Sequence, residues 1–291
     1  MQPGLVRHGF IRKAAMRVVL ALTRSTRLRG RQRLAFLLNR VVMPPDGYVL
    51  STLPEGIFME LDLTDRLQVG IHYLGEHESK ESDFILSSLP PGGVFVDVGA
   101  NIGWHTLKAA RHLGDGGKIY AFEPSPPNVV RLRRNLELNG ITNVVVEEVA
   151  LSDKEETVQM ASSRTRSGNA TMADREAPTQ SFEVTCIRLD DYARKHSLRG
   201  MDVVKIDVEG AELLVLRGMN GILRGPHPPV LLCEVNPIML RLMGTSPEVL
   251  VRYLEELGYT PHHVGKGGRL HPFRSLPPEK GLENYAFIRR A

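Results

Sequence analysis

Cysteine is scarce in this chain of 291 residues, which contains only Cys186 and Cys233. Two cysteines exclude a disulfide framework and a cysteine-based metal centre, so a reducing compartment, the cytoplasm, is the expected location. Both lie in apolar, strand-like runs and are predicted to be unreactive core residues. The sequence also contains no H-E-x-x-H, P-loop or G-x-S-x-G motif, so nothing supports the enzyme classes that these motifs mark.

Long hydrophobic runs are missing as well. No unbroken run is longer than Val18–Leu22, whereas a membrane span needs about 20 apolar residues. The sequence shows no signal-peptide core followed by a small-residue cleavage site. We therefore expect neither a membrane-spanning helix nor a secretory signal.

Acidic residues are absent from Met1–Pro45, which holds ten arginines and lysines. The rest of the chain has 27 basic and 33 acidic residues, a net charge of −6, so the overall charge of +4 and the pI near 9.1 come from this segment. A basic pI of this origin does not mark the main body as a nucleic-acid binder.

Phe10–Leu22 and Leu34–Val42 carry helical periodicity. Three alternatives remain for residues 1–45: packing on the domain, contact with anionic lipid, or an organelle transit peptide.

The stretch Val94–Gly103, with the sequence VFVDVGANIG, is the most informative in the chain. It begins as a nearly continuous apolar run, which is typical of a strand covered on both faces. It ends in Gly99, Asn101 and Gly103, which permit a tight turn, and an amphipathic helix pattern follows. A strand, a glycine turn and a helix in this order predict unpaired backbone N–H groups and a positive helix end, as in nucleotide sites. The alternative is a turn that needs glycine only for its geometry.

A second apolar strand, Lys118–Pro124, ends in Glu123, twenty residues after Gly103. In dinucleotide-binding folds an acid at about this distance hydrogen-bonds a ribose hydroxyl. Asp97 precedes the glycines, and the pattern D-x-G-x-x-x-G lacks the middle glycine of the dinucleotide fingerprint. A carboxylate at this point repels a pyrophosphate and suits an ammonium or sulfonium charge. S-adenosylmethionine carries both of these charges and a ribose, so the pattern favours it as the ligand.

Three separated segments resemble the FkbM family of S-adenosylmethionine-dependent methyltransferases. They read DVGANIGWHTL, FEPSPPNVVRLRRNLELNG and VVKIDVEGAELLVLRG, and the resemblance extends from about Gly75 to Asn236. It implies a class I methyltransferase fold and O-methylation of a hydroxyl on a sugar, lipid or polyketide-type metabolite. Family members often show Gly-x-x-Glu before the first core strand, and Gly75 with Glu78 matches it. The resemblance thus implies that Glu78 faces the cofactor, and a solvated glutamate at a helix start is the alternative.

Chain position and the resemblance together give the expected cofactor contacts. Ala150 and Leu151 are included because they end a predicted third strand, Val144–Leu151, where the adenine is expected to lie. The full set is Glu78, Asp97, Gly99, Ala100, Asn101, Gly103, Glu123, Pro124, Ser125, Ala150, Leu151 and Asp207.

Strands that alternate with helices predict an α/β fold, a Rossmann-like and mostly parallel sheet with an antiparallel strand at the C-terminal end. The remaining predicted strands are Thr157–Met160, Phe182–Ile187, Val203–Val208, Pro229–Val235 and Tyr285–Arg289. Residues 161–181 lack periodicity and are interpreted as a lid or acceptor loop. Three parts are expected: a basic helical segment 1–45, a strand and helix lead-in 46–90, and a cofactor-binding domain 91–291.

Candidate catalytic residues follow the predicted strands, because α/β folds bind ligands at the carboxyl ends of their strands. Methyl transfer to a hydroxyl needs alignment and a group that takes the proton. Asp207 is the first candidate and Glu209 the second, while Glu234 and Asn236 follow the next strand. Acids at two strand ends suit Mg²⁺, but the ligand set of magnesium-dependent O-methyltransferases is not reproduced, so no metal ligand is assigned. His105 is a further candidate base, with a packed histidine as the alternative.

Two other functions compete with methyl transfer. A nicotinamide-dependent oxidoreductase is disfavoured by Asp97 and the missing glycine, and a non-catalytic protein by the retained glycines and acids. For Asp207 the structural alternative is an ion pair with Lys205. The expected partners are a small-molecule hydroxyl acceptor, no nucleic acid and, through residues 1–45, a membrane surface. No motif identifies the acceptor or the oligomeric state.

Overall fold

The structure is a computed structural model that describes residues 15–24, 30–163, 166–171, 180–198 and 200–289. The chain divides into two compact units, which are described separately. The first unit lies within Met1–His77 and Arg164–Ser167, and the second within Glu78–Ser163 and Gly168–Ala291. No helix among the described residues is long and apolar enough to cross a bilayer.

The first unit consists of helices packed on a β-hairpin. Its elements are a helix at 15–23, α2 (Arg31–Val42), β1 (Tyr48–Thr52), the 3-10 turn η1 (Pro54–Gly56), β2 (Phe58–Asp62) and α3 (Arg66–Leu74). The hairpin is antiparallel, and Met59 and Leu61 of β2 are fully buried. The sequence analysis did not predict α3, whose N-cap Asp65 accepts a hydrogen bond from the Gln68 N–H.

A small core joins the N-terminal helices to the hairpin and α3. It contains Val19, Ala35, Val42, Leu63, Val69 and Tyr73. Two buried polar contacts fix the arrangement: Thr23 Oγ1 donates to the Tyr73 carbonyl at 2.8 Å, and Asn39 Nδ2 donates to the Leu63 carbonyl at 2.8 Å. Of the three alternatives for residues 1–45, the described residues show packing on neighbouring elements.

An eight-stranded sheet organises the second unit, in the order β13-β12-β14-β11-β10-β3-β4-β5. The strands are β3 (Val94–Val98), β4 (Lys118–Phe122), β5 (Val144–Glu147), β10 (Val203–Ile206), β11 (Val230–Val235), β12 (Tyr259–Val264), β13 (Leu270–Pro272) and β14 (Glu283–Arg289). The five from β11 to β5 are parallel, whereas β14, β12 and β13 are antiparallel. The expected fold class, with antiparallel pairing at the C-terminal end, is confirmed.

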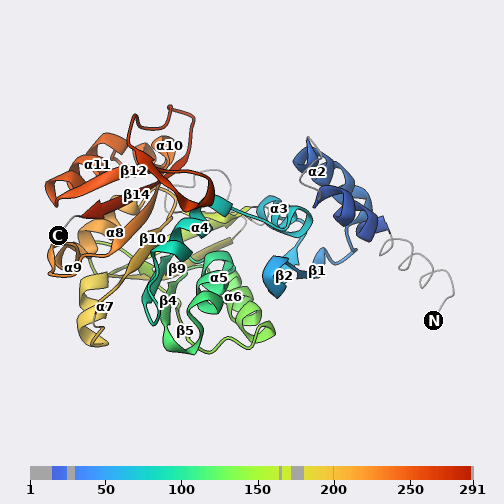
Figure 1. Ribbon diagram of the computed structural model, residues 1–291, viewed down its shortest axis with the longest axis horizontal. Coiled ribbons are helices and arrows are strands. Elements are labelled where there is room, and N and C mark those ends of the chain that lie inside the picture. The colour runs from blue at the N-terminus through green and yellow to red at the C-terminus, as the bar shows by residue number, and fades with distance from the viewer. Residues whose placement is uncertain (1–14, 25–29, 164–165, 172–179, 199, 290–291) are drawn as a thin grey trace. The chain divides into compact units, whose positions relative to one another are not determined.

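Helices cover both faces of this sheet because successive strand residues point to opposite sides. They are α4 (Ser79–Ser88), α5 (Trp104–Leu113), α6 (Pro126–Leu138), α7 (Leu189–Lys195), α8 (Glu212–Gly218), α9 (Asn220–Arg224), α10 (Pro237–Leu242) and α11 (Pro247–Glu256), with 3-10 turns η2 (Gly114–Gly116) and η3 (Lys266–Gly268). Phe95 and Val203 pack against α4 and α5, whereas Val96, Val204 and Cys233 pack on the α7, α8 and α11 side. Figure 1 shows α5 and α6 beside β4 and β5, and α10 and α11 beside β12 and β14.

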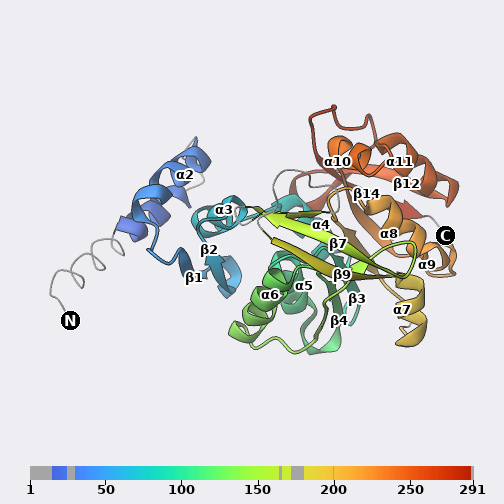
Figure 2. The same ribbon diagram turned by 180° about the vertical axis from the view of Figure 1, so that it is seen from behind.

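A second sheet, in the order β6-β9-β7-β8, contains segments that the sequence analysis placed elsewhere. Its strands are β6 (Ala150–Leu151), β7 (Glu156–Ser163), β8 (Arg166–Thr171) and β9 (Gln180–Ile187). The strands predicted at Thr157–Met160 and Phe182–Ile187 lie within β7 and β9, which pair antiparallel and run side by side in Figure 2. The prediction of a single strand at Val144–Leu151 is wrong, because β5 ends at Glu147 and the following β6 pairs with β9 in the second sheet. The aperiodic loop at 161–181 is also wrong in part, because β7 and β8 extend into it, while 172–179 lie outside the described residues.

Candidate active site

The carboxyl edge of the parallel strands carries most of the predicted site residues. Three non-glycine residues there or close by have a left-handed backbone: Glu78 (φ 45°), Asn101 (φ 51°) and Glu209 (φ 53°). Such conformations are strained for residues with a Cβ and cluster at functional sites. Glu78 immediately precedes α4, whereas Asn101 and Glu209 lie in the turns after β3 and β10. The edge is therefore the candidate site on backbone geometry as well as on sequence.

The glycine turn after β3 is closed by the neighbouring strand. The N–H groups of Gly99 and Ala100 donate to the Phe122 carbonyl at 2.9 and 3.1 Å, that of Asn101 to Glu123 Oε2 at 2.8 Å, and that of Gly103 to the Ala100 carbonyl at 2.9 Å. The prediction that the N–H groups of this turn are unpaired is thus wrong for these four residues. The reason is that β4 ends beside the turn, so its last carbonyl and the following carboxylate accept the hydrogen bonds.

Gly99 is required by a close approach of two backbones. Its φ is 80°, and a Cβ at this position would lie 1.9 Å from the Asp207 carbonyl oxygen. Gly103 has φ 94°, and a Cβ there would lie 2.4 Å from Leu132 Cδ1. The alternative weighed from the sequence, glycine for geometry, accounts for both positions. The contact also holds the turn after β3 against the end of β10.

Glu123 is anchored at the end of β4. Its side chain accepts hydrogen bonds from the N–H groups of Asn101 and Ser125 and from Asn128 Nδ2, at 2.8, 3.0 and 3.1 Å. Burial raises the pKa of Glu123 to about 7, although these hydrogen bonds act in the opposite direction. A carboxylate has about four acceptor positions, so three protein donors leave capacity for a ligand hydroxyl.

Asp97 and Lys205 face each other across β3 and β10. The two residues are in register, and Lys205 Nζ lies 3.7 Å from Asp97 Oδ1 and 3.1 Å from Asp207 Oδ2. Burial lowers the pKa of Lys205, but the carboxylates of Asp207, Asp97 and Glu78 outweigh it and raise the pKa above the ordinary value. Thr106 Oγ1 donates to Asp97 Oδ2 at 2.6 Å. The ion pair weighed from the sequence for Asp207 is present, and it extends to Asp97.

Three further glutamates lie at this edge, and the protein raises the pKa of each one. Burial, Asp207 and Glu212 raise the pKa of Glu209 to about 8. Burial raises the pKa of Glu212 to about 7, even though its Oε1 accepts from the Val208 and Gly210 N–H groups. Burial and the neighbouring carboxylates raise the pKa of Glu234 well above its usual range. The sequence analysis missed Glu212 because it also fits the helical pattern that follows.

His105 is a packed histidine that holds Glu78. Its Nε2 lies 2.9 Å from Glu78 Oε2, and its Nδ1 lies 3.3 Å from Ser82 Oγ. Ser82 Oγ also accepts a hydrogen bond from Trp104 Nε1 at 3.2 Å. Glu78 is therefore not a solvated glutamate, and both ring nitrogens of His105 are within hydrogen-bond distance of protein groups. The packed histidine weighed from the sequence is thus present, and a catalytic role for His105 stays a prediction.

The remaining predicted residues lie in structural positions. Asn236 is the N-cap of α10 and accepts from the Met239 N–H, whereas Ser125 precedes α6 and donates its N–H to Glu123. Pro124 is half-buried between Glu123 and Ser125. Ala150 and Leu151 lie in β6, with the Leu151 side chain in the hydrophobic core. Contact of Ala150 and Leu151 with an adenine stays a prediction.

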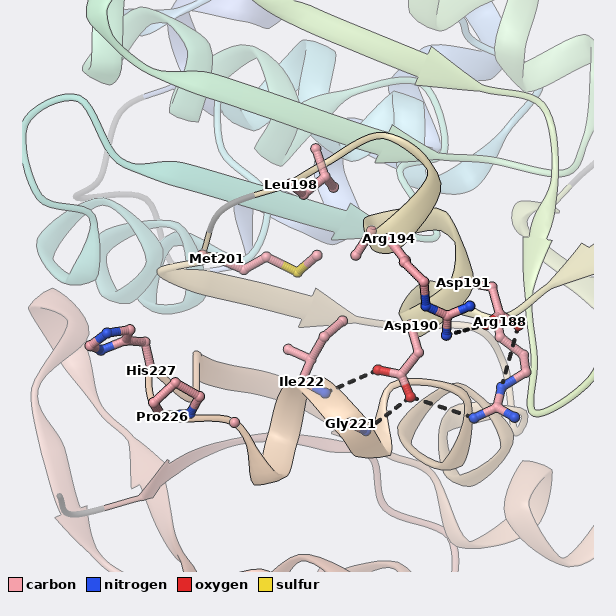
Figure 3. Close-up of a pocket in the computed structure, with 13 residues that line it drawn as sticks. Arg188, Asp190, Asp191, Arg194, Leu198, Met201, Gly221, Ile222, Pro226 and His227 are labelled. Carbon is pink, nitrogen blue, oxygen red and sulfur yellow. Dashed lines mark hydrogen bonds and ion pairs between the residues drawn. The ribbon is translucent and has the colours of Figure 1, made fainter.

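Two pockets lie at different edges of the main sheet. One, of about 600 Å³, adjoins the candidate site and is lined by Glu78, Ser79, Lys80, Glu81, Asp83, Lys266, Gly267, Leu282, Glu283 and Asn284. The other, of about 460 Å³, lies by Met201 and His227 before β10 and β11, at the amino ends of the strands (Figure 3). There Asp190 accepts from the Gly221 and Ile222 N–H groups and pairs with Arg188. These contacts join α7 to α9, so we interpret this second pocket as structural.

The family follows from a comparison with known proteins. The model of the Methyltransferase FkbM domain matches residues 97–261, more than half of the chain. The chain belongs to the FkbM methyltransferase family. Its α/β fold with a mostly parallel sheet agrees with the class I methyltransferase fold that the resemblance implied.

Individual relatives are similar over part of their length. Methyltransferase 1 of Beauveria bassiana is 29% identical over 154 residues, 46% of this chain and 61% of that protein. Hexuronic acid methyltransferase AglP of Haloferax volcanii is 27% identical over 173 residues, 59% and 65% of the two chains. The 31-O-demethyl-FK506 methyltransferase FkbM of Streptomyces tacrolimicus is 30% identical over 162 residues, which are 45% of this chain and 61% of that protein. The chain thus spans under two thirds of the length of these curated relatives.

The residues present fit the cofactor. Asp97 Oδ1 and Asn101 Oδ1 are buried, and neither has a hydrogen-bond partner among the described residues. Together with Glu123 they offer a carboxylate for a positive charge and acceptors for hydroxyl and amino groups. Within the described ranges, no group of three or more His, Cys, Asp and Glu side chains is arranged to hold a metal ion.

Proposed function

We propose that the protein transfers a methyl group from S-adenosylmethionine to a hydroxyl oxygen of a polar, hydroxyl-rich acceptor. The observation that carries this proposal is the position of Glu209, in a left-handed turn (φ 53°) shortly after the Asp207 carbonyl that meets the Gly99 turn, where burial and neighbouring carboxylates raise its pKa to about 8. A carboxyl with a pKa near neutral is matched to proton transfer from a hydroxyl at physiological pH. The family supplies the reaction, and this group supports oxygen as the atom that is methylated.

The cofactor side of the site is built from β3 and β4. Glu123 is placed to bind ribose hydroxyls with its remaining acceptor capacity. Asp97 Oδ1, which has no hydrogen-bond partner among the described residues and lies 3.7 Å from Lys205 Nζ, is proposed to face the positive charge of the cofactor. When bound, the cofactor supplies a sulfonium methyl group that an oxygen can attack in line. Alignment of that attack is the main task of the protein.

The turn after β10 supplies the acid–base chemistry. As the acceptor oxygen bonds to the methyl carbon, the carbon–sulfur bond breaks with its electron pair on sulfur, and the hydroxyl proton passes to Glu209. Asp207, paired with Lys205 at 3.1 Å, raises the pKa of Glu209 as a like charge. The sequence ranked Asp207 above Glu209, and the electrostatics favour the reverse order. Asp207 then acts by tuning and orienting, and His105 by holding Glu78.

The pocket beside Glu78 is the proposed acceptor pocket. Most of its lining residues carry a carboxylate, amide, hydroxyl or ammonium group, and such groups hydrogen-bond the hydroxyls of a sugar. Glu78 borders both this pocket and the network around His105, which links the acceptor to the cofactor turn. The name of the Haloferax volcanii relative, a hexuronic acid methyltransferase, supports this class of acceptor.

The first prediction concerns Glu209 and Asp207. We expect Glu209→Gln to lower kcat by about 100-fold or more, as loss of a general base does, with little change in cofactor affinity. In a plot of kcat against pH, kcat should rise with the pKa of Glu209, about 8. We expect Asp207→Asn to lower this pKa, because a like charge next to Glu209 is removed. The measurement is methyl transfer from labelled S-adenosylmethionine across pH, with monosaccharides, hexuronic acids and long-chain alcohols as acceptors.

Two results would contradict the assignment. Wild-type turnover in Glu209→Gln removes the proton-acceptor role, and an unmoved pH profile in Asp207→Asn removes the coupling. Transfer only to long-chain alcohols would overturn the acceptor class while leaving methyl transfer intact. Glu256→Gln, at an exposed glutamate on α11, is the control for the loss of one negative charge.

A further inference from the structure

The first unit exposes large hydrophobic side chains out of proportion to its size. Thirteen such side chains are exposed among the described residues, and seven of them lie before His77: Val18, Leu22, Leu37, Val41, Tyr48, Leu50 and Phe58. Single exposed aliphatic residues are ordinary on a soluble surface, whereas groups of them mark interaction sites. The first unit is therefore a candidate interaction surface.

The exposed residues form stripes along two helices. On α2, Leu37 and Val41 are 65% and 71% exposed and four residues apart, which places them on one face of the helix. On the helix at 15–23, Val18 and Leu22 have the same spacing and are 60% and 48% exposed. On α2 the opposite side is used for packing, since Ala35 and Val42 belong to the core of the unit, and on the helix at 15–23 the adjacent Val19 does. Each helix therefore buries apolar residues in the core of the unit and also exposes an apolar stripe to solvent.

Positive charge accompanies the stripes. Arg33 lies one helical turn before Leu37 on the same face, Arg40 lies beside Val41, and Arg17 lies beside Val18; all three arginines are exposed. Met1–Pro45 contains ten basic residues and no acidic one. A protein partner of ordinary composition does not require this segregation, whereas an anionic bilayer attracts arginines at its surface and takes up aliphatic side chains just below it.

We propose that the first unit binds the surface of an anionic lipid bilayer, with the Leu37–Val41 and Val18–Leu22 stripes inserted at the interface and the arginines on the lipid headgroups. Binding then combines apolar burial with electrostatic attraction, so it requires anionic lipid and weakens with salt. The inference rests on residues of the first unit alone and does not depend on the proposed methyl transfer.

The test is co-sedimentation of the full chain with vesicles of phosphatidylcholine, with and without phosphatidylglycerol, at low and high salt. We expect binding only to the vesicles that contain phosphatidylglycerol, and a loss of binding at high salt. Leu37→Ser with Val41→Ser removes one stripe and should weaken binding by about tenfold or more. Arg33→Glu with Arg40→Glu should weaken it by about fivefold or more for each arginine.

A matched control lies in the other unit. Val130 is 67% exposed on α6, in a segment with three arginines, so Val130→Ser repeats the chemical change outside the proposed surface. It should bind vesicles as the wild type does. All variants change exposed residues, and their thermal melting by circular dichroism should match the wild type.

Three results would overturn the proposal. The first is absence of binding to phosphatidylglycerol vesicles, and the second is equal binding by Leu37→Ser with Val41→Ser. The third is a change of oligomeric state in place of vesicle binding: light scattering would show a dimer for the wild type and a monomer for this variant, and neither would bind vesicles. A second copy of the chain would then cover the stripe.

Discussion

Glu123 shows how one side chain can serve both the fold and a ligand. It is buried and accepts three hydrogen bonds from the turn after β3 and the start of α6, so it joins two segments while remaining able to accept a further bond. Its raised pKa, about 7, means that the carboxylate is costly to keep charged without a partner. A ligand that donates hydrogen bonds to it relieves this cost.

The second prediction follows for Glu123→Ala. Removal of a charge-assisted hydrogen bond costs about 1.5–3 kcal/mol, so affinity for S-adenosylhomocysteine should fall by about tenfold or more. Isothermal titration calorimetry measures this affinity. Glu123→Gln keeps one acceptor oxygen, so its affinity should lie between those of the wild type and Glu123→Ala. Glu137→Ala is the control, because Glu137 is exposed on α6 and pairs with Arg134. Equal affinity in wild type and Glu123→Ala would remove the ribose role.

At the scale of elements, the turn between β10 and α8 concentrates carboxyl groups that the fold holds close to neutrality. Glu212 is fully buried, and its pKa is raised to about 7, while that of Glu209 is raised to about 8. Each is raised above its value in the unfolded chain. The folded state therefore retains protons that the unfolded state has released, and the stability that these groups contribute is lost as pH rises from about 4.5 toward 8.

The third prediction is a fall in the free energy of unfolding over this window. One unit of pKa shift corresponds to about 1.4 kcal/mol, so Glu212 alone contributes a loss of about 3 kcal/mol between pH 4.5 and 7. Glu212→Gln keeps the acceptor for the Val208 and Gly210 N–H groups and should flatten the profile, whereas Glu137→Gln should not. Urea denaturation at several pH values measures it. Equal slopes in wild type and Glu212→Gln would show that folding does not raise the pKa of Glu212.

The elements differ in how far the sequence predicts them. The parallel strands were predictable because burial on both faces leaves continuous apolar runs, as in Val94–Val98 and Val203–Ile206. Residues 144–151 were not, because their run of apolar residues does not reveal that β6 pairs with a distant strand, β9. The glycine turn was located correctly, but its N–H groups were assigned to a ligand because the pairing with Phe122 and Glu123 depends on how β4 is placed beside β3.

At the scale of the whole molecule, the cofactor residues and the basic segment belong to different units. Every predicted cofactor contact from Glu78 to Asp207 lies in the second unit, while the core of the first depends on Val19 and Ala35 together with Leu63 and Tyr73. A sequence reading along the chain separated residues 1–45 from those that follow. It could not show this shared core, because contacts between distant segments leave no periodicity.

The fourth prediction is that deleting Met1–Arg40 leaves the affinity for S-adenosylhomocysteine unchanged. The same deletion removes Val19 and Ala35 from the core of the first unit, so that unit should lose its cooperative unfolding. Calorimetric unfolding should show the transition of the first unit in the full chain and not in the shortened one. Loss of cofactor binding in the shortened protein would mean that the second unit depends on the first for its fold.

The contact between Gly99 and the Asp207 carbonyl has a consequence for how such an enzyme can acquire new acceptors. No side chain fits between the two turns, so the residues proposed to hold the cofactor and the acids proposed to act on the acceptor are kept at a fixed separation. Substitutions in the pocket formed by α4, η3 and the start of β14 leave that separation untouched. Changes of acceptor are therefore accessible by single steps on that side of the site, whereas the contact at Gly99 offers evolution almost no alternatives.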